Sequence, residues 1–277
     1  MFQMFSLPFM VQAFVVAVIT GLLLSYLGVH VVGRGIVFVD LALGQISSLG
    51  VAFAAFIGSG LTTIPLVFTL AGALLMSFIN IRDKRLKQEA IIGILYAFAS
   101  ALTVLLISKT PHGDSDIQEV LFGNILSVSW EQITLIAIVF GIIALVHGIF
   151  FRKFFTLTES FENGDHHVTG LFNTWNFLFY MSIGLSIVFA VKVNGVIPVF
   201  SYLIIPAVTA IMITKKNSSV VVVSLIISLI GSFAGLSFSF HYDFPAGSSV
   251  VAVLGTIFIL GAVYSLIAVS RLRNAKE

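Results

Sequence analysis

The sequence predicts an all-α polytopic membrane protein with about nine transmembrane helices, with broken helices near the second and the seventh span. Hydrophobic residues make up 58% and charged residues 9% of the 277 residues, whereas soluble domains average about 25% charged residues. Apolar runs follow one another from end to end, and many approach the roughly 20 residues needed to cross hydrocarbon. Basic residues cluster in alternate loops between these runs, which is typical of a fixed membrane orientation.

We expect residues 1–277 to form a single transmembrane domain, because the apolar runs leave no room for a separate soluble one. The net charge of +2 comes from the loop clusters and argues against a nucleic-acid surface. The absence of cysteine excludes disulfides, thiolate metal ligands and cysteine nucleophiles. No basic residue precedes the first run and no small-residue cleavage site follows it, so that run is expected to be a retained span.

The expected helices are the apolar runs at residues 8–29, 36–58, 62–81, 89–108, 131–150, 174–193, 197–213, 219–240 and 248–270. Counted back from the C-terminus, alternate loops hold twelve basic residues, with only Lys109 and Lys192 on the other side. The positive-inside rule then places the C-terminus in the cytoplasm and the N-terminus outside. An odd number of spans agrees with opposite termini.

The second run carries polar residues where hydrocarbon is expected. Gly33 to Gly50 reads GRGIVFVDLALGQISSLG, with Arg34 at its start and Asp40 and Gln45 within it. An ionisable group at the bilayer centre costs at least about 2.5–3.5 kcal/mol, so Asp40 is expected to face protein, water or an ion.

The seventh run is expected to be irregular. Between Asn194 and Ala210 it holds Pro198 and Pro206, which remove backbone hydrogen bonds that hydrocarbon cannot replace. Such breaks persist only where protein or a water-filled cavity satisfies the freed groups.

Two loops are long enough to have structure of their own. The external loop, 109–131, contains His112 near Asp114, Asp116 and Glu119. In the cytoplasmic loop, 152–173, Ser160 or Asn163 is expected to cap a short helix along the membrane face.

Six segments, in order along nearly the whole chain, carry a family resemblance: HVVGRGIVFVDLALGQISSLG, QEAIIGILYAFASALTVLLISK, EVLFGNILSVSW, SFENGDHHVTG, VNGVIPVFSYLIIPAVTA and GLSFSFHYDFPAGSSVVAVLG. The chain resembles the membrane permease subunits of metal-ion ABC transporters, which import zinc, manganese or iron. The resemblance implies a homodimeric permease in membrane lipid, driven by a cytoplasmic ATP-binding subunit and fed by an extracytoplasmic metal-binding protein. Its substrate would be a divalent metal ion, with zinc or manganese favoured over iron, and no cofactor would be bound permanently.

Two other function classes compete with this one. No G-x-x-x-x-G-K-[ST] phosphate loop occurs, so we expect a transport subunit without its own ATPase site rather than an enzyme. An intramembrane protease would need H-E-x-x-H or a G-x-S-G turn, and neither string is present. The alternative that stays open is a permease for a metal chelate or a small organic cofactor, as in the related siderophore and cobalamin importers.

The second span departs from the D-A-x-S-H signature of many family members. Aligned on Gly50, Leu41 takes the place of the aspartate and Gln45 that of the histidine, while Asp40 is one residue early, which turns its side chain by about 100°. Asp40 and Gln45 are candidates for a weak, transient metal pathway, since carboxylate and carbonyl oxygens suit hard or borderline ions. Asp40, within about 9 Å of the cytoplasmic end, is the expected inner-gate residue and Gln45 the better ion contact. The alternative is that Asp40 is a structural charge paired with Arg34.

Several histidines have two readings. His30 and His147, near cytoplasmic helix ends, are either borderline-metal ligands or histidines anchored at the headgroups. His112 with its acidic neighbours is either an external cation funnel or an ordinary solvated loop, and His241 with Asp243 is read the same way. The tandem His166 and His167 are better explained by a docking segment for the ATPase, for which the resemblance gives Phe161, Glu162 and Gly170 as matching positions.

Overall fold

The computed structural model describes residues 2–60, 62–79, 86–109, 123–162, 173–214 and 216–274, with side chains for all of these except 2 and 269–274. The described residues contain helices and no strand. The helices are α1 (Pro8–Gly33), α2 (Val39–Ile57), α3 (Thr63–Phe78), α4 (Gln88–Ile107), α6 (Trp130–Ile149), α7 (Phe151–Glu162), α8 (Thr174–Asn194), α9 (Val196–Ile213), α10 (Asn217–Tyr242) and α11 (Ala246–Asn274), with 3-10 turns η1 (Phe2–Ser6) and η2 (Ile125–Ser127).

Each of the nine expected spans corresponds to a helix. Eight helices in the described part of the chain are long and apolar enough to cross a membrane, and α3 is a shorter apolar helix of 16 residues. The all-α polytopic prediction is therefore confirmed. The additional helix α7 is too short to span and has charged residues on one side.

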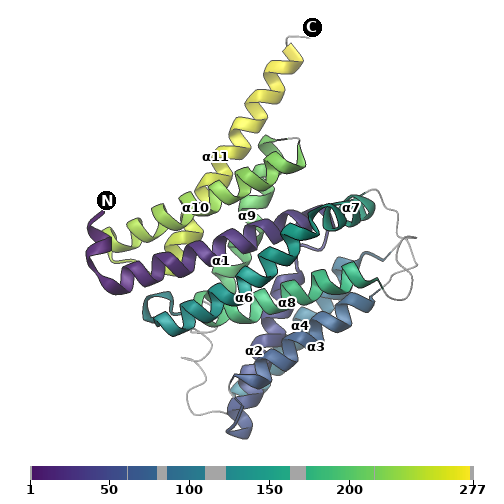
Figure 1. Cartoon of the computed structure of the whole chain (residues 1–277), viewed down its shortest axis with the longest axis vertical. Helices are drawn as coiled ribbons and strands as arrows, with labels where there is room; N and C mark the ends of the chain where they lie inside the picture. The colour runs from purple at the N-terminus through teal and green to yellow at the C-terminus, as the bar shows by residue number, and fades with distance from the viewer. Residues whose placement is uncertain are drawn as a thin grey trace.

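The helices form two groups joined by α8 (Figure 1). In one group, α1 packs against α6, α7, α9 and α10, while α11 packs on α9 and α10. In the other, α2 packs against α3 and α4. Helix α8 contacts α2 and α3 on one side and α6, α7 and α9 on the other, and its Phe179 and Tyr180 are among the largest fully buried side chains.

Glycines allow the closest helix contacts. A Cβ at Gly28 in α1 would overlap the backbone carbonyl oxygen of Leu203 in α9. Gly231 and Gly235 of α10 face Leu254 and Val250 of α11 in the same way, so this glycine pair makes a helix contact within one chain. Small residues that let backbones approach are the usual solution in membranes, where the hydrophobic effect does not drive helices together.

The helical path is interrupted near both predicted places, but the prolines are not the cause. Gly195, with φ of 81°, separates α8 from α9. Helix α9 then runs unbroken through Pro206, and the prediction that the prolines break this span is wrong. Pro198 is the third residue of α9, where the N–H group would have no intrahelical partner. Pro206 has no backbone N–H, so one hydrogen bond is missing within an otherwise regular helix.

The turn between α1 and α2 is a Schellman motif. Gly35, with φ of 65°, donates its N–H to the carbonyl of Val32, and Ile36 donates to Val31, at 3.0 and 3.2 Å. Such a pair of bonds satisfies carbonyls that the helix end would leave free, and the left-handed residue is usually glycine. The motif fixes the direction in which Arg34 and the start of α2 leave α1.

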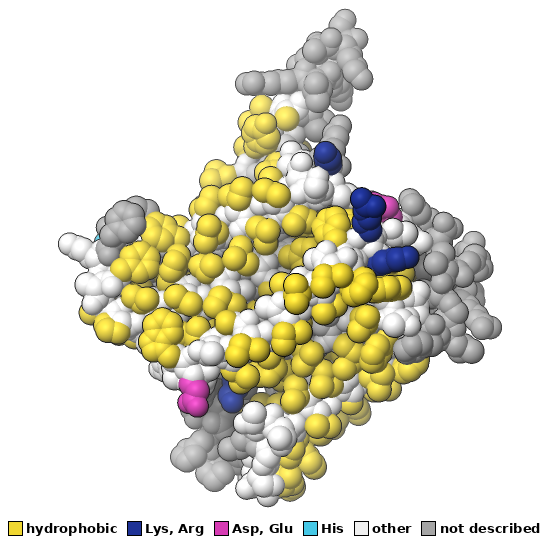
Figure 2. Space-filling model, viewed as in Figure 1, with side chains coloured by type: hydrophobic (Ala, Val, Ile, Leu, Met, Phe, Trp, Pro, Cys, Tyr) yellow, Lys and Arg dark blue, Asp and Glu magenta, His cyan; other side chains and the backbone are white. Residues whose placement is uncertain are grey.

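Helix α7 follows α6 after a single residue, Phe150. Ser160 lies inside α7 and is not its N-cap, which rules out the first of the two expected caps, while Asn163 lies outside the described residues and stays a prediction. Phe154, Phe155, Leu157 and Thr158 are buried, whereas Arg152 and Lys153 are exposed. Figure 2 shows a broad hydrophobic surface with Lys and Arg side chains gathered at the end of the molecule where α7 lies in Figure 1. The helix therefore lies with one face on the bundle and one face free.

Candidate functional site

Asp40 is a buried carboxylate at the start of α2. Its side chain is 2% exposed, and neither carboxylate oxygen has a hydrogen-bond partner among the described residues. It is the second residue of the helix, where the N-terminal end of the helix dipole favours a negative charge. The alternative prediction is an ion pair between Asp40 and Arg34. This ion pair is not formed, because the described polar partners of Arg34 are a threonine and an asparagine.

Gln45 lies five residues further along α2, which is about 1.4 turns, and is half-buried. A Cβ on the preceding Gly44 would lie 3.6 Å from the methyl groups of Val196 and 3.9 Å from Val191. This part of α2 therefore packs at the junction of α8 and α9. In the described part of the chain no three His, Asp or Glu side chains come together in a way that could hold a metal ion. Asp40 and Gln45 thus suit brief contact with a passing ion better than tight binding, which would block release.

Arg34 reaches from the end of α1 to two other helices. Its Nε donates to Thr158 Oγ1 of α7 at 3.2 Å, and Nη1 donates to Asn176 Oδ1 of α8 at 3.2 Å. The guanidinium carbon lies 3.6 Å from the centroid of the Phe179 ring, which adds a cation–π contact. Arg34 is 8% exposed and Nη2 has no partner among the described residues. Among the described residues, this buried cation is thus held by neutral groups.

His30 shares the Thr158 hydroxyl with Arg34. Its Nδ1 lies 2.9 Å from Thr158 Oγ1, and Nε2 lies 3.2 Å from the Tyr26 hydroxyl. The Thr158 hydroxyl donates its one hydrogen to the Phe154 carbonyl at 2.9 Å, so we infer that His30 Nδ1 donates to Thr158 and Nε2 accepts from Tyr26. Both ring nitrogens are occupied, so binding a metal would displace one of these partners. The metal role of His30 stays a prediction.

His147 lies close to His30 but makes different contacts. Its ring stacks on Phe154, with 3.9 Å between centroids and 5° between planes. The side chain is 1% exposed, and neither nitrogen has a hydrogen-bond partner among the described residues. The centroids of the two histidine rings are 6.3 Å apart. The Arg34 guanidinium lies beside this histidine pair, since it shares the Thr158 hydroxyl with His30. Its positive charge would repel a divalent cation, so the pair is a poor environment for a metal ion.

The other candidate residues are placed as follows. Phe161 is half-buried near the end of α7, with its ring centroid 5.6 Å from the Arg34 guanidinium carbon, and Glu162 is the exposed last residue of that helix. His112 and Gly170 lie outside the described residues. The docking role of Phe161, Glu162 and Gly170 stays a prediction, as does the external funnel.

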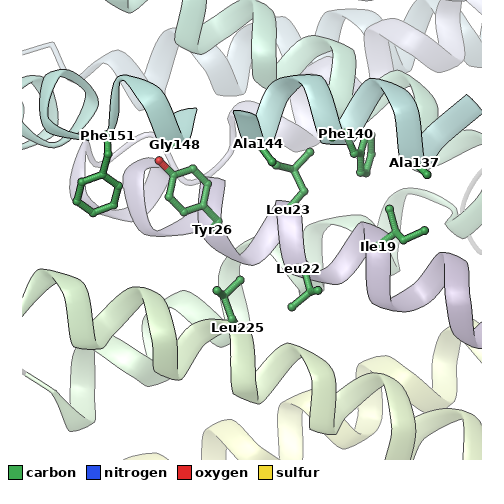
Figure 3. A pocket seen from close by; sticks show the side chains of 11 residues that line it. Ile19, Leu22, Leu23, Tyr26, Ala137, Phe140, Ala144, Gly148, Phe151 and Leu225 are labelled. Atoms are coloured by element: carbon green, nitrogen blue, oxygen red, sulfur yellow. The ribbon is translucent and has the colours of Figure 1, made fainter. Parts of the chain in front are cut away.

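A separate hollow of about 410 Å³ lies between α1, α6 and α10 (Figure 3). Its lining residues are Ile19, Leu22, Leu23, Tyr26, Ala137, Phe140, Gly141, Ala144, Gly148, Phe151 and Leu225. The Tyr26 hydroxyl is the one polar side-chain group in this set. A hydrated cation would exchange its water shell there for at most one side-chain oxygen, so the lining of this hollow does not suit an ion route.

Comparison with known proteins identifies the group to which this arrangement belongs. The sequence pattern of the ABC 3 transport family matches residues 6–265, which is nearly the whole chain. The chain belongs to the ABC 3 transport family. As a member of this family it is a multi-pass membrane protein and a membrane permease subunit of an ABC transport system.

Among curated relatives, this ABC 3 chain is 26% identical to the manganese transport system membrane protein MntC of Halalkalibacterium halodurans, over 95% of this chain and 89% of that one. It is 29% identical to MntC of Listeria monocytogenes, over 93% and 91%. It is 27% identical to the chelated iron transport system membrane protein YfeD of Yersinia pestis, over 94% and 87%. Among solved structures, it matches PsaBC from Streptococcus pneumoniae in complex with Fab at 25% identity and a TM-score of 0.76, over 92% and 91%.

Sequence reasoning on this ABC 3 chain missed Thr158 and Asn176. A signal was present for Thr158, since it falls on the apolar face of an amphipathic helix, three and four residues after the buried Phe155 and Phe154. Thr156, two residues away, is exposed. Asn176 carried no such signal, because only the folded chain brings it to Arg34, 142 residues away.

Proposed function

We propose that this chain is the permease subunit of an ABC importer that moves a divalent metal ion across the membrane by alternating access. Similarity over nearly the full length to membrane proteins named for manganese and iron transport carries the proposal. Those names favour manganese or iron as the cargo, and zinc stays a candidate from the sequence resemblance. Two copies are proposed to form the pore.

In this proposal Asp40 and Gln45 contact the ion in turn. A buried carboxylate without a hydrogen-bond partner is costly unless something compensates it during function. A divalent cation passing the start of α2 would supply that compensation for a short time. Gln45 would offer its side-chain oxygen five residues further along the helix, and since the described residues form no cluster of His, Asp or Glu ligands, affinity would stay low.

The partners follow from what the chain lacks. It contains no phosphate-binding loop of the G-x-x-x-x-G-K-[ST] type, so a separate cytoplasmic ATP-binding subunit is proposed to supply the energy. An extracytoplasmic metal-binding protein is proposed to deliver the ion. The end of α7, with Phe161 and Glu162, is the proposed contact with the ATP-binding subunit. The basic residues beside it support a cytoplasmic location for this end of the bundle.

Uptake by the reconstituted complex tests the proposal. The chain is co-purified with its ATP-binding subunit, placed in lipid vesicles and supplied with ATP and with its binding protein loaded with manganese, iron or zinc. We expect ATP-dependent accumulation of at least one of these ions. No accumulation of any divalent metal by an assembled complex that hydrolyses ATP would contradict the proposal.

A metal chelate is the second candidate cargo. One relative, YfeD of Yersinia pestis, is named for chelated iron transport. The same vesicles distinguish the two cargoes when bare iron and an iron chelate labelled on its organic part are offered in parallel. Accumulation of the organic label with the iron would favour the chelate, and accumulation of iron alone would favour the bare ion.

A further inference from the structure

We propose that Arg34, Thr158 and Asn176 form a latch that makes α7 and the start of α8 move together with the turn from α1 to α2. The inference rests on the proposed function and identifies the residues that would carry motion from the cytoplasmic face to the metal pathway. In this role Arg34 is a positioning residue, since it acts on Asp40 and Gln45 through the backbone of the turn.

The contacts of Arg34 join three segments that are far apart in the sequence. Its hydrogen bonds at 3.2 Å to Thr158 and to Asn176 cross 124 and 142 residues. Stacking on Phe179, one turn after Asn176, holds the guanidinium plane against α8. Arginine is suited to this position because its donors are arranged in a rigid fork that can reach two acceptors at once.

Arg34 of the latch is close in the sequence to the proposed pathway residue Asp40. Arg34 is followed directly by Gly35 and Ile36, whose Schellman hydrogen bonds fix the turn. Val39 then begins α2, and Asp40 is its second residue. A displacement of the α1 end is therefore transmitted over five residues to the buried carboxylate, with no flexible linker between them.

Thr158, at the other end of the latch, lies on α7 close to the proposed contact with the ATP-binding subunit. Thr158 is one turn before Phe161 and Glu162, which are the proposed contacts with the ATP-binding subunit, and the polar face of α7 is exposed. The Thr158 hydroxyl is fully used, since it donates to Phe154 and accepts from Arg34 and His30. Removing the hydroxyl would leave two buried donors without acceptors, while most of the packing of the side chain would remain.

A matched pair of threonine substitutions tests the latch. Thr156 also donates its hydroxyl to the carbonyl four residues earlier, at 2.8 Å, but it is exposed and lies on the other face of α7. In reconstituted vesicles we expect Thr158→Val to lower the number of metal ions moved per ATP hydrolysed by about tenfold, since a hydrogen bond to a charged group is lost. ATP hydrolysis itself should persist, and Thr156→Val should change neither quantity. An unchanged ratio in Thr158→Val would overturn the latch.

A covalent replacement tests the same idea in a single protein. A Cβ at Gly33 would lie 2.7 Å from Thr158 Cγ2, which puts the two Cβ atoms within about 4.2 Å, in the range that a disulfide bridges. The chain has no native cysteine, so the variant Gly33→Cys/Thr158→Cys has only this pair. We expect poor coupling in the reduced form and about tenfold better coupling after oxidation, because the disulfide replaces the hydrogen bond.

The outcomes separate the latch from the proposed function. If the oxidised double variant is blocked or stays uncoupled, α7 does not move as one body with α1 and the latch is wrong. If the reduced form couples like the unmodified chain, the Thr158 hydroxyl is not needed and the latch is also wrong. If the unmodified complex hydrolyses ATP but moves no metal, the proposed function itself fails.

Discussion

Two buried ionisable side chains near the turn between α1 and α2 have opposite surroundings. Arg34 has acceptors on two helices and an aromatic ring beneath it, whereas Asp40 has no hydrogen-bond partner among the described residues. A structural charge is normally paired or fully hydrogen-bonded when buried. The arrangement around Arg34 therefore fits a role in holding helices together, and the arrangement around Asp40 fits a role in function.

Replacing Asp40 with asparagine is expected to separate stability from activity. The substitution keeps the shape and replaces a buried carboxyl group, which has no hydrogen-bond partner among the described residues, by a neutral amide. We expect the thermal midpoint of the purified chain to stay equal or rise, and metal uptake to fall about tenfold, equivalent to about 1.4 kcal/mol. Differential scanning fluorimetry and vesicle uptake measure the two effects.

Asp243→Asn is the control for this substitution. Asp243 is exposed and has a left-handed backbone with φ of 54°, which asparagine also tolerates. Neither stability nor uptake should change in this variant. Normal uptake by Asp40→Asn would show that Asp40 is a structural charge after all.

At the scale of elements, much of the helical framework was predictable and the junctions were not. Long apolar runs identify spans because hydrocarbon leaves helices as almost the only structure that satisfies the backbone. The sequence pattern therefore located the nine apolar helices of the described part of the chain. It misjudged Pro198 and Pro206, because the cost of a proline depends on its place in the helix and on neighbours that a pattern does not reveal.

The candidate site was predictable only in part. Asp40 and Gln45 stand out as polar residues in an apolar run. The latch around Arg34 could not be assembled from the sequence, because Thr158 and Asn176 are ordinary polar residues whose meaning comes from contacts more than 100 residues away. The pairing of Asp40 with Arg34 looked reasonable from their spacing, yet the Schellman turn directs Arg34 back toward α7 and α8.

The contact between α1 and α9 should be sensitive to one added methyl group. Gly28→Ala would place a Cβ against the backbone carbonyl of Leu203, and overpacking of this kind typically costs about 1–3 kcal/mol. Gly141→Ala is the matched control, because a Cβ at Gly141 in α6 meets nothing within 4 Å and alanine favours helix by up to about 1 kcal/mol. We expect the thermal midpoint to fall for Gly28→Ala and to hold or rise for Gly141→Ala. Equal midpoints would contradict the close contact.

For the whole molecule, the basic end of the bundle is expected to lie in the cytoplasm. Because the chain has no native cysteine, single cysteines report sidedness without background. Ser59→Cys, between α2 and α3, should react with a membrane-impermeant maleimide on intact cells. Lys153→Cys, on the exposed face of α7, should react only after the membrane is opened. The reverse pattern would invert the proposed orientation.

The shortness of α3 has a consequence for the surrounding bilayer. At about 1.5 Å per residue, its 16 residues extend about 24 Å, less than the roughly 30 Å of hydrocarbon in a typical membrane. Val67 and Leu75 of this helix are more than 60% exposed, so its outer face meets lipid or another protein surface. Where that face meets lipid, local thinning of the bilayer beside α3 is one way in which this hydrophobic mismatch is accommodated. Lipids with longer acyl chains would increase the mismatch beside α3, and because α3 packs against α2, acyl-chain length becomes a variable that reaches the helix of Asp40 and Gln45 from the bilayer side.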